Sequence, residues 1–222
     1  MNLRFSLIFL LFIAATGLTA QQVISDEEMQ DLLNNRVIQV DNPIISNFLL
    51  IRQIDQANSF TAIQNQQGSL QNNILVNQDG AGNTGYLEQT GSGLETYLWQ
   101  YQSSNMASLW SEGENVKVEV KQDGSENTIN SFIENYYLVS RSAYLVQKGN
   151  NNRIDLALFG DEVPSVADAQ EVQISQTGNN HSVEAILENS FAPINITQTA
   201  GVNGEGMQVN ISNSAFSFPM KK

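Results

Sequence analysis

Apolar and polar side chains alternate in short runs along most of this chain, and polar turns separate the runs. The unit at 74–89 is complete: Ile74, Val76 and Gln78 stand at alternate positions, a turn follows, and a second alternating run begins at Asn83. Because successive side chains of a strand point to opposite faces, this pattern predicts a strand, a tight turn and a second strand.

The unit recurs seven times, each time with a Gln that closes the first run and an Asn or His five residues later. The pairs are Gln53/Asn58, Gln78/Asn83, Gln100/Asn105, Gln122/Asn127, Gln147/Asn152, Gln176/His181 and Gln198/Asn203. A second Gln stands six residues after the Asn in the first two copies, at Gln64 and Gln89. The first glutamines are 25, 22, 22, 25, 29 and 22 residues apart, a period that indicates a repeat architecture. The seventh copy fits only with two extra residues in its turn.

Charge separates the two faces of the predicted strands. The 42 alternate positions counted from the Gln and the Asn of the first six copies hold no Asp, Glu, Lys or Arg, although 15% of the chain is charged. The intervening positions carry charges such as Arg52, Glu119 and Lys121. One face is therefore expected to be buried and the other wet. Stacked copies predict an all-β solenoid of about seven rungs with two stacked parallel sheets over 48–213, followed by a short tail at 214–222.

The first residues do not belong to the repeat. Arg4, an apolar run over 7–15 and small residues ending at Ala20 are typical of a secretory signal peptide at 1–20, because the run is too short to span a bilayer. Residues 21–47 are expected to be a leader or a cap with a short helix around 26–34 and a strand at 37–40. Either function fits this segment.

Composition narrows the function. The chain has no cysteine, so a secreted form must be held by its core or by its backbone ladder. Removal of Arg4 leaves nine basic and 23 acidic residues, a net charge of −14. Nucleic acid is a poor partner for such a chain, and the acidity is expected to keep copies apart before assembly.

The residues give no sign of catalysis. With one His and no Cys, His/Cys metal clusters are excluded, and His181 is interpreted as a substitute for Asn at a turn. Asp79-Gly80 and Asp123-Gly124 lack the spacing of calcium loops. We expect no enzyme activity, no metal and no cofactor.

The recurring amides carry the functional hypothesis. Buried amides must be hydrogen-bonded, and identical amides stacked one rung apart can satisfy one another as a ladder that also fixes the register. The predicted ladder residues are Gln53, Asn58, Gln64, Gln78, Asn83, Gln89, Gln100, Asn105, Gln122, Asn127, Gln147, Asn152, Gln176, His181, Gln198 and Asn203. The alternative is that these amides only cap turns inside a closed monomer.

The motif Gln-x-Gly-x-x-Asn followed six residues later by Gln, complete at 78–89, resembles the repeat of the curlin family, the subunits of bacterial curli. Partial copies at 122–127, 147–152 and 176–181 resemble it too, and the similarity covers about 50–212. The resemblance implies a subunit that is secreted across the outer membrane by a secretion machinery and polymerises with itself and other curlin-like subunits. The product would be an extracellular amyloid fibre at the bacterial surface, serving adhesion and biofilm matrix, without stable membrane insertion.

The chain departs from the family pattern in two respects. The family's Ser six residues before each Gln is missing, and the second Gln is lost after the second copy. These departures suit a minor, nucleating or capping subunit about as well as a major one.

Other functions stay open. A monomeric solenoid that binds a surface polysaccharide or ice is the main alternative, although no regular outward Thr row is present. A β-helical carbohydrate-active enzyme would need a cluster of carboxylates and bases that the repeats lack. The outward aromatics Tyr97, Trp99, Trp110 and Tyr144 predict a lateral contact face. The ends of the column discriminate between fibre and monomer, since a monomer should cap both edges.

Overall fold

The computed structural model describes residues 6–9, 47–65, 70–135, 140–160, 170–187, 193–200 and 204–212, and all its regular elements are strands. The strands are β1 (Ser6–Phe9), β2 (Asn47–Ile54), β3 (Ser59–Gln64), β4 (Asn72–Asp79), β5 (Thr84–Gln89), β6 (Glu95–Tyr101), β7 (Ser111–Glu112), β8 (Val116–Asp123), β9 (Ile133–Glu134), β10 (Arg141–Lys148), β11 (Gln170–Thr177) and β12 (Ile194–Thr199). The helix and strand expected at 26–34 and 37–40 lie outside the described residues.

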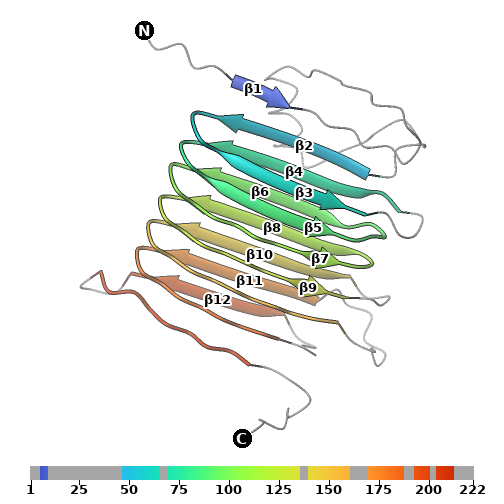
Figure 1. The fold of residues 1–222 in the computed structure, drawn as a ribbon. Helices are drawn as coiled ribbons and strands as arrows, with labels where there is room; N and C mark the ends of the chain where they lie inside the picture. The colour runs from blue at the N-terminus through green and yellow to red at the C-terminus, as the bar shows by residue number, and fades with distance from the viewer. Residues whose placement is uncertain are drawn as a thin grey trace, which may run out of the picture.

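One large sheet, which we call the main sheet, orders the molecule (Figure 1). Its strands follow the order β1-β2-β4-β6-β8-β10-β11-β12, and the seven strands from β2 to β12 are parallel. Each repeat supplies one of these strands, and each first glutamine pairs with the first glutamine of the next repeat. The prediction of an all-β solenoid with about seven repeats is therefore confirmed.

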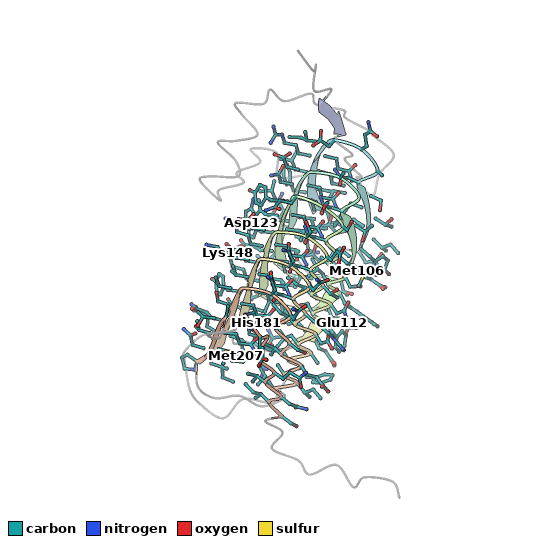
Figure 2. The ribbon with its side chains drawn as sticks, turned by 90° about the vertical axis from the view of Figure 1, so that its left-hand side faces the viewer. Met106, Glu112, Asp123, Lys148, His181 and Met207 are labelled. Atoms are coloured by element: carbon teal, nitrogen blue, oxygen red, sulfur yellow. The ribbon has the colours of Figure 1, made fainter. Side chains whose placement is uncertain are left out.

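The core lies between the main sheet and the segment that follows the turn in each repeat, which we call the second arm. Inward side chains from both arms are fully buried, as Val118 and Val120 on β8 and Ile129 on the facing arm show. In the first repeat the inward residues Leu49, Ile51, Phe60 and Ala62 are only partly buried. Figure 2 shows Asp123 and Lys148 on one side of the column and Met106 and Glu112 on the other.

The second arm is less regular than the main sheet. It pairs as β3 with β5 and β7 with β9, and isolated bridges such as Asn130 with Asp155 join further rungs. From the third repeat onward apolar residues of this arm take positive φ, for example Leu109 at 60° and Phe132 at 77°. The rungs stay bonded, since Leu109 N donates to Asn130 O at 2.8 Å and Ser131 N to Asp155 O at 2.7 Å.

The outer face of the main sheet differs from the expectation. Outward side chains of the first three rungs form a second apolar cluster in which Leu50 and Leu75 are fully buried. Tyr97 and Trp99 are buried there too, 2% and 8% exposed, with rings stacked 5.9 Å apart. Trp110 is exposed, but its side chain is on the outer face of the second arm rather than on the main sheet. The prediction of one lateral aromatic face was therefore wrong. Tyr97 and Trp99 are buried on the outer face of the main sheet, whereas Trp110 is exposed on the opposite side of the column.

Candidate functional site: amide ladders and strand edges

The first glutamines form an uninterrupted chain of hydrogen bonds along the column. Each side-chain Nε2 donates to the Oε1 of the next rung. The steps run from Gln53 to Gln78 at 2.5 Å, to Gln100 at 2.7 Å, to Gln122 at 2.8 Å, to Gln147 at 3.0 Å, to Gln176 at 2.9 Å and to Gln198 at 2.7 Å. All but Gln53 are buried. The ladder that the spacing predicted is therefore present at this position.

Four of these glutamines, Gln78, Gln100, Gln122 and Gln198, also join the two arms of the solenoid. Each Gln is the last inward residue of its main strand, so its amide reaches carbonyls of the facing arm. Gln78 Nε2 donates to Ser59 O at 3.1 Å, and Gln100 Nε2 donates to Thr84 O at 3.0 Å. Such a bond contributes about 1 kcal/mol net, whereas a buried amide left unpaired costs about 1–3 kcal/mol. A Gln that makes both kinds of bond, as Gln78 and Gln100 do, thus fixes both the register between rungs and the spacing between arms.

The asparagines form a second ladder at the corner after the turn. The Oδ1 of each accepts the backbone N–H of the next rung's Asn, as from Asn105 N to Asn83 Oδ1 at 3.1 Å and from Asn127 N to Asn105 Oδ1 at 3.2 Å. The side-chain Nδ2 donates forward to the neighbouring turn, for instance from Asn127 to Gly149 O at 2.7 Å. Nδ2 also donates backward, from Asn105 to Asn83 Oδ1 at 3.0 Å. Each of these Asn side chains therefore bonds its turn to the rung before it and to the rung after it.

His181 occupies the Asn position of the sixth repeat and makes the bonds of an Asn. Its backbone N donates to Asn152 Oδ1 at 3.0 Å. Its ring Nδ1 accepts from Met207 N at 3.0 Å, as an Asn Oδ1 accepts from the following rung. Its Nε2 lies 3.1 Å from Thr177 O, the carbonyl four residues back to which Asn105 Nδ2 donates in its own repeat. These partners require the neutral ring with the proton on Nε2.

In the last repeat Met207 stands where an Asn stands elsewhere. Asn203 lies outside the described residues. Ser182 N donates to Met207 O at 2.9 Å, as Met106 N donates to Asn127 O three rungs earlier. The turn after Gln198 therefore contains more than the two extra residues expected from the sequence. Met207 takes the Asn position that was expected for Asn203, and Val209 takes the next inward position of this arm.

The second glutamines do not extend the ladder. Gln64 and Gln89 stand opposite one another in the register of β3 and β5. Gln89 is fully buried, and neither its Nε2 nor its Oε1 has a hydrogen-bond partner. Ile133, Leu158 and Leu187 are buried at the equivalent place in later repeats. This position has changed from polar to apolar along the chain.

Asn72 was not anticipated as a structural amide. It is fully buried at the far end of β4. Its Oδ1 accepts from Gly93 N at 3.0 Å and Leu94 N at 2.9 Å, and its Nδ2 donates to Thr90 O at 3.0 Å. It fastens the connection into the third repeat. The signal was available, because Asn72 stands where the resembling family has Ser, six residues before the Gln.

The two edges of the main sheet differ. At one edge β1 pairs antiparallel with β2, joining Ser6 to Ile54 and Phe9 to Ile51. At the other edge β12 pairs with β11, and no further strand of the described residues follows it. Ala200 N donates toward β11, to Thr177 O at 2.9 Å. Since alternate residues of a strand direct their N–H groups to opposite sides, those of Thr197 and Thr199 point away from β11.

In the part of the chain that the structure describes, no helix has the length and hydrophobicity needed to cross a membrane. Comparisons with models of protein families, with curated proteins and with solved structures found no match for this chain.

Proposed function

We propose that this chain is a structural subunit of curli-like extracellular amyloid fibres and that its copies polymerise, or nucleate polymerisation, by stacking end to end. In this proposal the subunit is exported across the outer membrane by a secretion machinery. At the bacterial surface it joins other copies and similar subunits in a fibre that serves adhesion and the biofilm matrix. The resemblance of the repeats to curlin repeats supports export and location, and the ladder supports the mode of assembly.

One observation carries the mode of assembly. Inside the column Gln122 Nε2 contacts three oxygens: Met106 O at 2.7 Å, Asn127 O at 2.9 Å and Gln147 Oε1 at 3.0 Å. At the last rung Gln198 Nε2 makes the two equivalent carbonyl contacts, with Ser182 O at 3.0 Å and Met207 O at 2.6 Å. The third partner would be a glutamine of another copy. Gln53, the first member of the ladder, is the natural candidate.

The junction would also extend the main sheet. The N–H groups of Thr197 and Thr199 face the open edge, so β12 can pair with β2 of the next copy in the same parallel register. In the structure β1 pairs with β2 and so covers the edge of β2 that this contact would need. Loss of residues 1–20 as a signal peptide would remove β1 and expose β2, which couples export to assembly.

The test uses purified residues 21–222, released from denaturant at micromolar concentration. We expect thioflavin fluorescence to rise after a lag, and the product to give reflections at about 4.7 Å along the fibre axis and about 10 Å across it. A chain that seeds a curlin subunit without polymerising alone would be a nucleator. A β-rich monomer that remains soluble for days and seeds nothing would contradict the proposal and favour a monomeric solenoid that binds a surface polysaccharide.

A further inference from the structure

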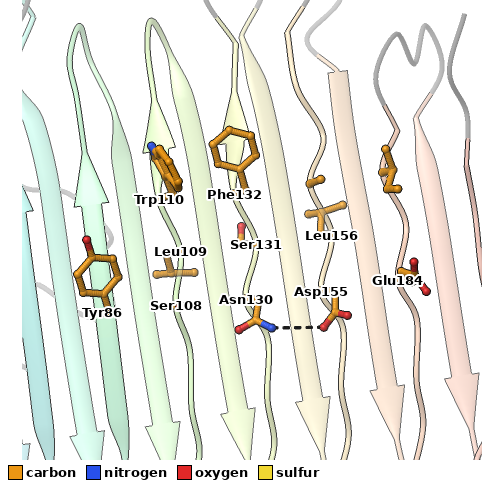
Figure 3. A pocket seen from close by; sticks show the side chains of 12 residues that line it. Tyr86, Ser108, Leu109, Trp110, Asn130, Ser131, Phe132, Asp155, Leu156 and Glu184 are labelled. Carbon is orange, nitrogen blue, oxygen red and sulfur yellow. Dashed lines mark hydrogen bonds between the residues drawn. The ribbon is translucent and has the colours of Figure 1, made fainter. Parts of the chain in front are cut away.

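A groove runs along the outside of the second arm and is not used by the ladders. It has a volume of about 460 Å³, within the size range of ligand sites. We call it the outer groove, and its characteristic side chains are Tyr86, Trp110, Asn130, Phe132, Asp155 and Glu184 (Figure 3). They come from five successive repeats, so the groove follows the axis of the column.

Aromatic rings form one side of the outer groove. The Trp110 and Phe132 rings meet edge to face with centroids 4.7 Å apart, and Phe132 meets Phe159 in the same way at 5.5 Å. Trp110 is 44% exposed and Tyr86 is 41% exposed, although neither ring is needed by the core. Trp110, packed on the half-buried Phe132, gives the groove an exposed apolar wall, and an apolar patch of this kind marks a binding site more often than a single exposed residue does.

Carboxylates dominate the polar groups. Asp155 and Glu184 line the groove, and Glu88, Glu112 and Glu134 lie on the same outer face. Burial, together with the neighbouring Glu112 carboxylate, raises the pKa of Glu134. Arg153 is the cation of this face among the described residues, and it is already ion-paired with Asp155. The face therefore has an excess of negative charge and suits a positively charged ligand.

The backbone of the arm has little to offer to a peptide. Its amides and carbonyls bond from rung to rung, as Asp155 N does to Ile129 O at 3.1 Å, so a peptide cannot add as a further strand here. The groove offers side chains instead: flat rings, the Asn130 amide and carboxylates. Sugar rings have apolar faces that pack on aromatic rings, and their hydroxyls can bond to amides and carboxylates. Amino groups on the sugars would pair with the carboxylates and lie close to the electron-rich face of Trp110.

We propose that the outer groove binds an extended polysaccharide whose sugars carry free amino groups, such as a deacetylated glucosamine polymer, with its length parallel to the column axis. Sugar faces pack on Trp110 and Phe132, and ammonium groups pair with Glu184 and with the carboxylates beside the groove. The groove is complete within one chain. The binding therefore does not rest on fibre formation, and in a fibre the sites would line up in a row.

The probe is a set of soluble β-1,4-linked glucosamine oligomers, titrated calorimetrically into the full chain at two salt concentrations. The matched probes are fully N-acetylated oligomers of the same length, which keep the sugar faces but lose the charge. We expect the charged oligomers to bind, more weakly at high salt, and the acetylated ones to bind about tenfold more weakly or not at all.

Variants locate the site. Trp110→Thr should weaken binding about tenfold through loss of ring packing and of the cation–π contact. The double variant Glu134→Gln/Glu184→Gln keeps the shape of both side chains and should flatten the salt dependence. Glu119→Gln, on the outer face of the main sheet, is the matched control and should leave binding unchanged. Far-ultraviolet circular dichroism of each variant checks that the column is intact.

Three results would overturn the proposal. One is equal affinity for acetylated and deacetylated oligomers, and another is binding that survives both groove variants. The third is a lysine-rich peptide of equal charge that binds at least as tightly and is lost in the same variants, which would assign the groove to a peptide. Failure of fibre formation would leave these measurements unaffected, so the two proposals can fail separately.

Discussion

At the scale of single residues, the molecule depends on the buried, hydrogen-bonded carboxamides of the Gln and Asn ladders. Gln122 accepts from Gln100 and donates both to Gln147 and to carbonyls of the facing arm. A side chain of the same length without an amide could fill the space but would leave these partners without a bond. This explains why the position before each turn holds Gln in every repeat.

Gln122→Ala should lower the free energy of unfolding by about 2–4 kcal/mol, because it leaves a cavity and strands the Oε1 of Gln147. Gln173→Ala, which removes an exposed outward Gln on β11, should change it by less than about 0.5 kcal/mol. Urea unfolding of the two variants measures the difference. Equal effects would show that the ladder does not stabilise the column.

The ring of His181 can be exchanged for the group it replaces. His181→Asn should stay within about 1 kcal/mol of the unchanged chain, since a carboxamide supplies one acceptor and one donor at this corner. His181→Leu should cost about 1–3 kcal/mol, because the Met207 N–H and the Thr177 carbonyl lose their partners. A leucine variant as stable as the asparagine variant would mean that the ring only fills space. Thermal unfolding of both variants decides between these outcomes.

Much of the residue pattern could be read from the sequence, and the exceptions have physical reasons. The spacing of Gln and Asn predicted the ladder because a strand has a fixed side-chain period. Met207 was missed because the long last turn moves the Asn position, and no local pattern records how far. Leu50 and Leu75 interrupt the polar outer face, so the sequence does contain a signal for the outer apolar cluster.

At the scale of elements, the turns hold the rungs at their close spacing. Gly149 has φ 108°, and a β-carbon on it would lie 2.1 Å from the carbonyl oxygen of Gly178 in the next turn. The stacked turns therefore leave no room for a side chain at this place. The second arm behaves differently, since Leu109 and Phe132 take positive φ without Gly, Asn or Asp. Sequence patterns predict such angles only through those residue types, so this departure from a regular strand could not be foreseen.

Gly149→Ala should destabilise the chain by about 2 kcal/mol or more, because backbone strain and a collision with the adjacent turn add together. Gly204→Ala is the matched control: φ is also positive, at 71°, but no described atom lies within 4 Å. It should cost only about 1 kcal/mol of strain. Denaturant midpoints of the two variants separate the collision from the strain, and equal losses would argue against tight stacking of the turns.

At the scale of the whole molecule, the column is a directional object with unlike ends. One edge is paired by β1, and β12 directs N–H groups away from the column at the other. The architecture followed from the repeat period, whereas the pairing of β1 did not, because the first residues share no pattern with the repeats. Assembly in the proposed function depends on these edges rather than on the sides of the column.

Thr197→Pro should slow fibre elongation strongly while leaving the single chain folded. Proline removes an N–H that points to the open edge, and its ring obstructs pairing there. Thr197→Ala keeps the N–H and should elongate at nearly the normal rate. Thioflavin kinetics seeded with preformed fibres, together with circular dichroism of the monomers, measures both effects. Unchanged elongation of the proline variant would show that β12 is not the growing edge.

The opposite directions of the two ladders have a further consequence. Glutamine amides donate from each rung to the next, as Gln78 does to Gln100, whereas asparagine amides also donate to the rung before, as Asn127 does to Asn105 at 2.9 Å. Aligned amide dipoles add up along a chain and polarise one another, which in an α-helix leaves partial charges at the ends. Here two antiparallel chains of dipoles lie within the same column and oppose each other. The partial charges that the two ladders leave at each end of the column are therefore opposite in sign and offset one another.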